Sequence, residues 1–387
     1  MLTLSHLAQH FYSGAPILYQ NIRTELNLSY TEIGAMTGAS NVFGGLLQIE
    51  YSILGKRLPR RLLLSGANLL MSFGCLLIGI TDRFVGLLTG NVVVGAGQAG
   101  HHPVSISMIS QKFIGKSSGR ALSIFYGLGY IGNITSPIIL TTIALFLGWR
   151  TSFFFLAIIP LIISIVLFYY LRDEPLGDKA LGAVSKDNFF NDAKSALRVK
   201  GTIYVLLAQG FIAGGTGMGV LTTWVPQFLR DSVGGLGLGL IESGLVSASS
   251  TLGGIVGIII MGYVADRLGH LKIAMICLSS TIITVFLLTF YSSFTLILVL
   301  HLFIIGFSMY SISSLLQTHL VLTAQPHQRD ILLGLYLTFG FGTSSIWAAV
   351  MGNIIDKYSF NSIWIMTSLL GIVALFMLFK ANKKLNR

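Results

Sequence analysis

Long apolar stretches recur along the whole chain and constrain its fold more than any other feature of the sequence. They cover residues 2–19, 31–54, 62–79, 85–109, 120–147, 153–171, 202–229, 240–264, 273–290, 294–318, 331–354 and 361–379. A helix of about 20 apolar residues can cross a bilayer. Only 10% of the 387 residues are charged, against about 25% in a soluble domain. The sequence therefore predicts an all-α integral membrane protein with twelve transmembrane helices.

The basic residues are divided unevenly between the two sides of such a membrane. Of the 25 Lys and Arg residues, 20 fall in the loops of one side and 5 in the loops of the other, whereas the acidic residues divide nearly evenly. Loops rich in Lys and Arg stay in the cytoplasm. This pattern predicts both termini in the cytoplasm of an inner or plasma membrane. It also accounts for the net charge of +11 without a nucleic-acid partner.

A polar segment at residues 172–200 divides the twelve spans into two groups of six. We expect it to be a cytoplasmic central loop between an N-terminal bundle, residues 1–171, and a C-terminal bundle, residues 201–387. The loop after the second span, residues 55–61, occupies the position that residues 266–272 occupy after the eighth span. Such a correspondence is expected of a transporter built from parallel repeats.

A short motif joins the eighth and ninth spans. It begins at Gly262, ends at Gly269 and carries the adjacent charges Asp266 and Arg267. Glycine suits a tight turn here, because Gly269 can adopt a positive φ and Gly262 would let two helices approach closely. The Gly–x–x–x–Asp–Arg–x–Gly element resembles the cytoplasmic loop signature of the major facilitator superfamily, a family of secondary transporters. The resemblance implies that Asp266 stabilises one gating state, helped by a neighbouring helix terminus.

Further elements extend the resemblance over nearly the whole chain. Residues 148–153 resemble the family's Gly-Trp-Arg-x-x-Phe junction into the sixth span, and residues 91–98 resemble its Arg–x–x–x–Gly–x–Gly element with Asn91 in place of the arginine. Gly55 stands where the family has an aspartate, which puts a latch in the N-terminal half in doubt. The resemblance implies two pseudo-symmetric six-helix bundles around a midplane site that opens alternately to each side.

Within the superfamily, short elements resemble the fosmidomycin-resistance-like exporters. These elements are His6, residues 28–30, residues 102–103 and residues 125–137. The last of them lies in the fifth span, where Gly127, Gly129 and Gly132 thin the helix for close packing. Together with Pro137 they loosely resemble the glycine–proline element of antiporters, although Ser136 stands where that element has glycine.

Ionisable residues inside membrane spans are costly and are therefore candidates for function. They are His6, His10, Glu50, His101, His102, His301 and His319. His102 precedes Pro103, which bends a helix, and histidine can exchange a proton near neutral pH. His102 is thus one candidate for proton coupling, or else a histidine held by a neighbouring helix. Glu50 is the other candidate, or else a partner for Arg120 or Arg57.

His6 and His10 lie four residues apart and share one face of the first span. The resemblance implies that this span lines the central cavity. The pair could bind a metal ion, but without further ligands we expect no metal site.

Uncharged polar and aromatic side chains are further candidates for the cavity wall. The amides are Gln9, Gln98, Asn133 and Gln209, and the aromatic pair is Tyr126 and Tyr130. Each amide can hydrogen-bond a polar solute or join two helices. The tyrosines share a helix face, as aromatic cavity walls do, although packing between helices would give the same pattern.

These features predict a secondary active transporter that moves a small organic solute by alternating access. No catalytic or nucleotide-binding motif and no cofactor site is present in the sequence. We expect proton-coupled efflux of an amphiphilic or anionic compound by a monomer. Uptake of an organic acid or a sugar-like solute is the nearest alternative, and a non-transporting membrane sensor is an alternative of another class.

Overall fold

The computed structural model describes residues 1–55, 57–113, 116–171, 194–213, 219–325 and 328–385. The chain forms two compact units, Met1–Gly182 and Ala183–Arg387. The described residues form helices and the turns between them, as the apolar pattern predicts, and no strand occurs among them. Most of the expected central loop lies outside the described residues.

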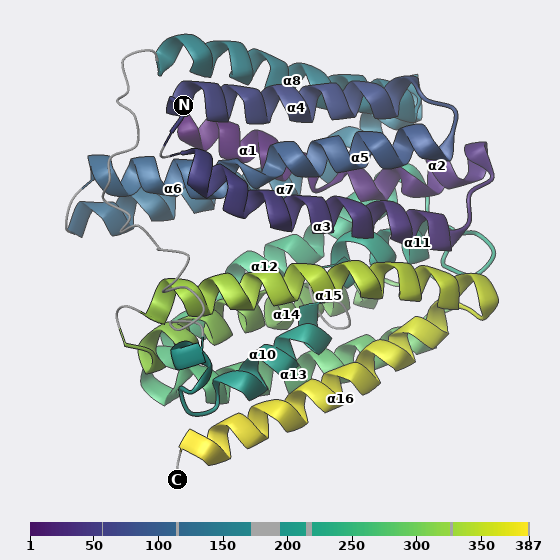
Figure 1. Ribbon diagram of the computed structural model, residues 1–387. Helices are drawn as coiled ribbons and strands as arrows, with labels where there is room; N and C mark the ends of the chain where they lie inside the picture. Colours follow the sequence, from purple (N-terminus) through teal and green to yellow (C-terminus); the bar gives the residue numbers. More distant parts are fainter. Residues whose placement is uncertain (56, 114–115, 172–193, 214–218, 326–327, 386–387) are drawn as a thin grey trace. The chain divides into compact units, whose positions relative to one another are not determined.

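The N-terminal unit is a bundle of helices, drawn in purple to blue-green in Figure 1. Its helices are α1 (Leu2–Tyr12), α2 (Tyr19–Leu26), α3 (Tyr30–Leu54), α4 (Arg60–Ile80), α5 (Phe84–Ala99), α6 (His101–Lys112), α7 (Lys116–Leu147) and α8 (Trp149–Tyr170). Helix α4 packs against both α5 and α8, and α1 packs along α7. Each of the first six predicted spans is therefore helical. The first is divided into α1, a short 3-10 turn at Ala15–Leu18 and α2.

The C-terminal unit is a second bundle, drawn in green to yellow in Figure 1. Its elements are α10 (Thr202–Phe211), a wider π turn at Val220–Trp224, α11 (Val225–Arg230), α12 (Leu240–Leu268), α13 (His270–Leu287), a 3-10 turn at Leu288–Phe290, α14 (Leu296–Thr323), α15 (Arg329–Lys357) and α16 (Phe360–Leu385). Helix α12 packs against α14, and α13 packs against both α14 and α16. These elements correspond to the last six predicted spans.

Glycines set the distance between α12 and α14. A Cβ atom at Gly253 would overlap the carbonyl oxygen of Phe303, and one at Gly257 would overlap that of Phe307. Between membrane helices both the lipid and the partner are apolar, so close backbone packing replaces the hydrophobic effect as the source of cohesion. The small residues inside these spans therefore serve helix packing, as expected from the sequence.

Eight of the described helices are long and apolar enough to cross a membrane. Helix α16 illustrates how they meet the lipid. Its exposed apolar side chains include Ile365, Leu369, Ile372, Phe376 and Phe379, which recur at the helical period along one face. The opposite face contributes Ala374, Leu378 and Ala381 to the core of the C-terminal unit.

The fourth predicted span is broken into α5 and α6. Helix α5 ends at Ala99 and α6 begins at His101, so Gly100 lies at the break. Pro103 explains its position, because proline has no N–H group to donate to the carbonyl four residues earlier, that of Ala99, and its ring clashes there. The regular helix is therefore interrupted one turn before the proline, in the span where the sequence predicts a bend.

A polar contact ties the end of α2 to the start of α8. Glu25 accepts a hydrogen bond of 2.7 Å from Trp149 Nε1 and forms an ion pair with Arg150, which also donates to the carbonyl of Thr81 at the end of α4. The hydrogen bond from Arg150 holds the pKa of the Glu25 carboxyl below its ordinary value, and the bond from Trp149 adds to this effect. The contact lies outside the apolar spans.

This contact makes the stability of the folded protein depend on pH. Because the pKa of Glu25 is lowered by folding, its stabilising contribution is present above the ordinary value near 4.5 and is lost as pH falls below it. We expect Glu25→Gln to lower the apparent Tm at pH 7, and the difference from the wild type to shrink toward pH 4. Thermal unfolding in detergent measures both. Asp82→Asn, which removes an almost fully exposed pair with Arg83, serves as the control. A difference that grows on acidification would contradict the assignment.

Candidate functional site

Two glycines of α7 bring α1 close enough for its histidines to enter the helix interface. A Cβ atom at Gly129 would overlap Nδ1 of His6, and one at Gly132 would lie 2.7 Å from the carbonyl oxygen of Leu7. At Gly127 a Cβ atom would meet nothing within 4 Å in the described residues. The predicted thinning of the fifth span is thus confirmed for Gly129 and Gly132 and is wrong for Gly127, which lies on another face of the helix.

His6 and His10 are held by hydrogen bonds to α7 and contact each other. Nδ1 of His6 donates to the carbonyl oxygen of Phe125 over 3.0 Å, and Nδ1 of His10 donates to Oδ1 of Asn133 over 3.0 Å. The two Nε2 atoms lie 2.9 Å apart. When both Nδ1 atoms carry the proton, neutral imidazoles present bare lone pairs at Nε2. In that tautomer a cation can bridge the two lone pairs, whereas with one proton at Nε2 the same contact is a hydrogen bond.

His102 completes a cluster of three imidazoles. Its ring centroid lies 5.0 Å from that of His6 and 6.3 Å from that of His10. One ring nitrogen from each of the three residues lies within 4.8 Å of the other two. His6 is buried, whereas His10 and His102 are half-buried. The cluster is therefore open on one side.

Two tyrosines of α7 border this histidine cluster (His6, His10 and His102). The ring of Tyr126 stacks on His102 with centroids 6.1 Å apart, and the ring of Tyr130 lies 5.5 Å from that of His10. Tyr126 is exposed and Tyr130 is half-buried. The tyrosines therefore form the rim of the cluster rather than a contact buried between helices.

The neighbouring His101 turns away from the cluster, as expected for adjacent helical residues. Asn68 Nδ2 donates to Ser5 Oγ over 2.9 Å, and the same hydroxyl forms a hydrogen bond of 3.0 Å with Nδ1 of His101. This chain joins α4, α1 and α6. Neither Ser5 nor Asn68 was predicted from the sequence. Ser5 lies four residues before Gln9, so it shares a face of α1 with that candidate residue, and this spacing could have identified it.

The remaining predicted amides are not part of the cluster. Gln9 and Gln98 bond each other's backbone, with each Nε2 donating to the other's carbonyl oxygen over 3.3 Å. These bonds join α1 to α5, which is the helix-joining interpretation. Gln209 lies buried in α10 of the C-terminal unit. It packs closely against Gly340, because a Cβ atom added there would lie only 2.7 Å from Gln209 Nε2. His301 contacts the Tyr291 hydroxyl over 3.2 Å in the same unit.

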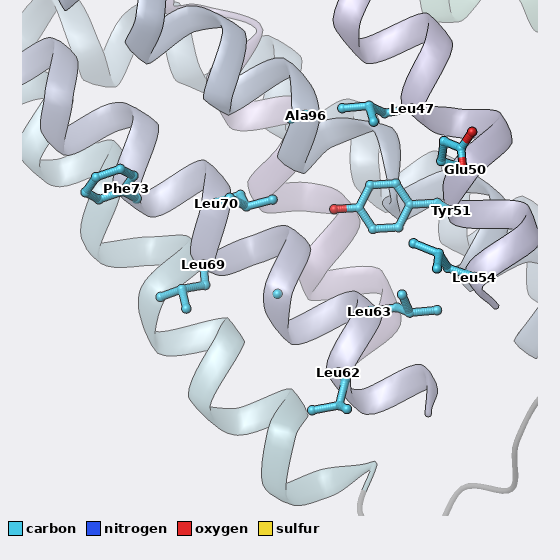
Figure 2. Close-up of a pocket in the computed structure, with 11 residues that line it drawn as sticks. Leu47, Glu50, Tyr51, Leu54, Leu62, Leu63, Leu69, Leu70, Phe73 and Ala96 are labelled. Atoms are coloured by element: carbon cyan, nitrogen blue, oxygen red, sulfur yellow. The ribbon is translucent and has the colours of Figure 1, made fainter. Parts of the chain in front are cut away.

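Glu50 borders an apolar groove of about 720 Å³ between α3 and α4, shown in Figure 2. The groove is lined by Leu47, Glu50, Tyr51, Leu54, Leu62, Leu63, Gly66, Leu69, Leu70, Phe73 and Ala96. Glu50 is the one charged residue among them and is exposed. Among the described residues no ion pair joins Glu50 to Arg57, and the side chain of Arg120 lies outside the described part. The groove therefore offers Glu50 an apolar surface.

The motif at residues 262–269 is more helical than predicted. Helix α12 continues through Asp266 and Arg267 to Leu268, and the turn into α13 is Gly269 alone, with φ of 95°. The positive φ predicted for Gly269 is confirmed. Within the C-terminal unit, a Cβ atom at Gly262 would meet nothing within 4 Å, so the close approach predicted there is absent from this unit.

One polar pair bridges this one-residue turn, and a second contact lies just before it in α12. Asp266 Oδ1 lies 3.3 Å from Nε2 of His270, one helical turn further along the chain. The guanidinium of Arg267 lies 4.7 Å from the ring centroid of Tyr263 and also bonds its hydroxyl. Asp266 thus has a local partner in α13.

Solved structures share this fold. A crystal structure of a nucleoside transporter, NupG, matches with a TM-score of 0.81 at 13% identity and covers 98% of both chains. A bacterial homologue of the human lysosomal transporter Spinster matches with a TM-score of 0.77 at 18% identity and covers 100% of this chain and 96% of its own. At such identities the match establishes the fold alone.

Curated relatives match over part of their length. A probable L-galactonate transporter of Escherichia coli is 26% identical over 64% of this chain and 56% of its own length. A nitrite extrusion protein of Bacillus subtilis is 26% identical over 70% of this chain and 66% of its own. The quinolone resistance protein NorB of Staphylococcus aureus is 24% identical over 62% of this chain and 49% of its own. The chain thus spans about half to two thirds of these relatives.

The family model of the Major Facilitator Superfamily matches residues 3–348 and 234–386. The match covers nearly the whole chain, whereas the narrower resemblance to the fosmidomycin-resistance-like exporters stays a prediction. The chain belongs to the major facilitator superfamily, so it is a multi-pass membrane protein of a family of secondary transporters.

Proposed function

We propose that this transporter exports a small amphiphilic or anionic organic solute in exchange for protons. The observation that carries the proposal is the polar and aromatic surface that α1, α6 and α7 form inside the N-terminal unit. Polar side chains within membrane spans are costly, so a concentration of them marks a pathway for a solute or an ion. The relatives named for nitrite extrusion and quinolone resistance support the outward direction.

The rim of the histidine cluster is the surface that would contact the solute. Tyr126 and Tyr130 present ring faces and hydroxyl groups, and the half-buried His102 adds a ring nitrogen. Such a surface suits a compound with an apolar body and one or two polar groups, because ring faces bind the body while few polar groups fix its orientation. Gln9 and Gln98, which bond each other's backbone, support the helices behind this surface.

The coupling proton is assigned to Glu50. Of the two candidates from the sequence, Glu50 has gained support, because it borders an apolar groove and forms no ion pair with Arg57. Glu50 is the one carboxylate among the residues that line the groove, so it is the lining group proposed to carry the proton.

Glu50→Gln tests this assignment, because glutamine keeps the shape and cannot release a proton. In proteoliposomes with an imposed pH gradient, we expect the variant to lose gradient-driven accumulation of any fluorescent amphiphilic or anionic compound that the wild type moves. Exchange of that compound without a gradient should continue. Glu242→Gln, an exposed residue in the first turn of α12, is the matched control. Full gradient-driven accumulation by Glu50→Gln would refute the assignment.

Uptake of an organic acid is the second candidate function. It is favoured by the relative named as a probable L-galactonate transporter. The same proteoliposomes separate the two directions: an exporter accumulates solute on the acidic side of the membrane, and a symporter on the alkaline side. A sensor without transport would produce neither gradient.

Asp266 should act on the transport cycle rather than on solute binding. It pairs with His270 across the Gly269 turn, where a change of charge alters how α12 and α13 meet. We expect Asp266→Asn to slow transport by about tenfold or more, which corresponds to about 1.4 kcal/mol in the slow step, with KM nearly unchanged. Asp82→Asn is the matched control. A large rise in KM at normal turnover would place Asp266 in binding instead.

The proposed orientation puts both chain termini in the cytoplasm of the cell membrane, because Lys and Arg are concentrated in the loops of that side. A cysteine at Lys384, near the end of α16, should react with a membrane-impermeant maleimide only in inverted vesicles. A cysteine at the exposed Ser232, after α11, should react only in whole cells. Lys186, a third position in a predicted cytoplasmic loop, lies outside the described residues. Labelling of Lys384→Cys in whole cells would overturn the orientation.

A further inference from the structure

The histidine cluster has the atoms and spacing of a metal site. His6, His10 and His102 each offer one ring nitrogen, and these nitrogens lie within 4.8 Å of one another. Zinc–imidazole bonds of about 2.0–2.1 Å at tetrahedral angles would put the nitrogens about 3.4 Å apart. The 2.9 Å between Nε2 of His6 and of His10 is slightly shorter than this. The pair is thus near the required spacing, and the His102 nitrogen, within 4.8 Å of both, would move toward them when an ion binds.

The hydrogen bonds behind two of the imidazoles are those of metal ligands. A ligating histidine usually donates its other ring N–H to a carbonyl or carboxylate oxygen, which fixes the tautomer and the ring orientation. His6 does so to the backbone of Phe125, and His10 does so to Oδ1 of Asn133. In this tautomer both Nε2 atoms have a free lone pair, and the two atoms lie 2.9 Å apart, so one cation could be bound by both.

The backbone also prepares the site. His6 and His10 are separated by four residues on α1, the helical spacing at which two histidines can hold one ion. His102 enters from the first turn of α6, directly after the break at Gly100. Gly129 leaves the space that the His6 ring occupies, because a side chain there would overlap Nδ1. The spacing of His6 and His10, the helix break before His102 and the absence of a side chain at Gly129 therefore all help to bring the three rings together.

We propose that His6, His10 and His102 bind one divalent transition-metal ion of the Zn²⁺, Co²⁺ or Ni²⁺ class. Three neutral imidazoles and no carboxylate suit such ions and not Mg²⁺ or Ca²⁺, which require oxygen ligands. Three protein ligands leave the fourth position of a tetrahedral ion open, as in sites where the metal also binds an outside molecule. The half-buried His10 and His102 leave that position accessible beside Tyr126. The site depends neither on the direction of transport nor on the driving ion.

Calorimetry on the purified full-length chain tests the site directly. The protein is freed of its affinity tag, stripped with a chelator and titrated in detergent with ZnCl₂, and in parallel with MgCl₂. We expect saturable binding of one Zn²⁺ per chain and no binding of Mg²⁺. With CoCl₂ in place of zinc, the intense visible absorption of four-coordinate cobalt should appear at the same stoichiometry.

Variants locate the ion. His102→Gln should weaken Zn²⁺ binding by at least about tenfold, and Asn133→Ala, which removes only the support of His10, should weaken it by about 10–100-fold. Gly129→Ala should displace the His6 ring and weaken binding, whereas Gly127→Ala, with open space around it, should not. His319→Gln, a half-buried histidine of α14, should bind as the wild type does.

The test uses variants that remove a histidine and variants that do not, so it still gives an answer if one variant folds poorly. Elution as a single monodisperse peak is required of each variant, and Gly129→Ala and Asn133→Ala test the site without removing a histidine. Absence of saturable Zn²⁺ or Co²⁺ binding by the wild type would overturn the proposal. So would unchanged binding in His102→Gln or in both Gly129→Ala and Asn133→Ala. The measurement involves no transport, so its failure leaves the proposed export function untouched.

Discussion

A bilayer interior contains no water to bond the peptide backbone, so a chain that crosses it must satisfy its N–H and C=O groups within helices. The described residues follow this constraint almost throughout. Departures from regular helix are consequently informative. The break at Gly100 presents His102 at the start of α6, and the 3-10 turn at Ala15–Leu18 ends the helix that carries His6 and His10. The candidate site thus lies between two interruptions of the regular backbone.

The contact between α1 and α7 both packs the two helices together and positions the histidines of the candidate site. Gly129 and Gly132 remove side chains where the two helices cross, and the histidines of α1 occupy the space. The same approach brings the carbonyl of Phe125 and the amide of Asn133 within hydrogen-bonding distance of the two rings. A glycine in a membrane helix is usually explained by close packing alone. Here it also makes room for polar groups that bond across the interface.

Most of the fold could be predicted from the sequence, because apolar length and the Lys and Arg bias act locally along the chain. The shared face of His6 and His10 and the positive φ of Gly269 could also be predicted, since both follow from local geometry. The joining of His102 to that pair could not, because it depends on how helices distant in sequence pack. For the same reason Gly127 and Gly262 were assigned to close contacts that the two units do not contain. Which face of a helix meets a neighbour is a property of the bundle.

All three imidazoles and the groups that orient them belong to the N-terminal unit. A motion of one unit against the other, carried out as a rigid body, leaves their mutual distances unchanged. Under such a motion the three nitrogens would keep the same spacing throughout a transport cycle. A bound ion would then be released when the site opens to the other side of the membrane, and the three histidines would not have to move apart.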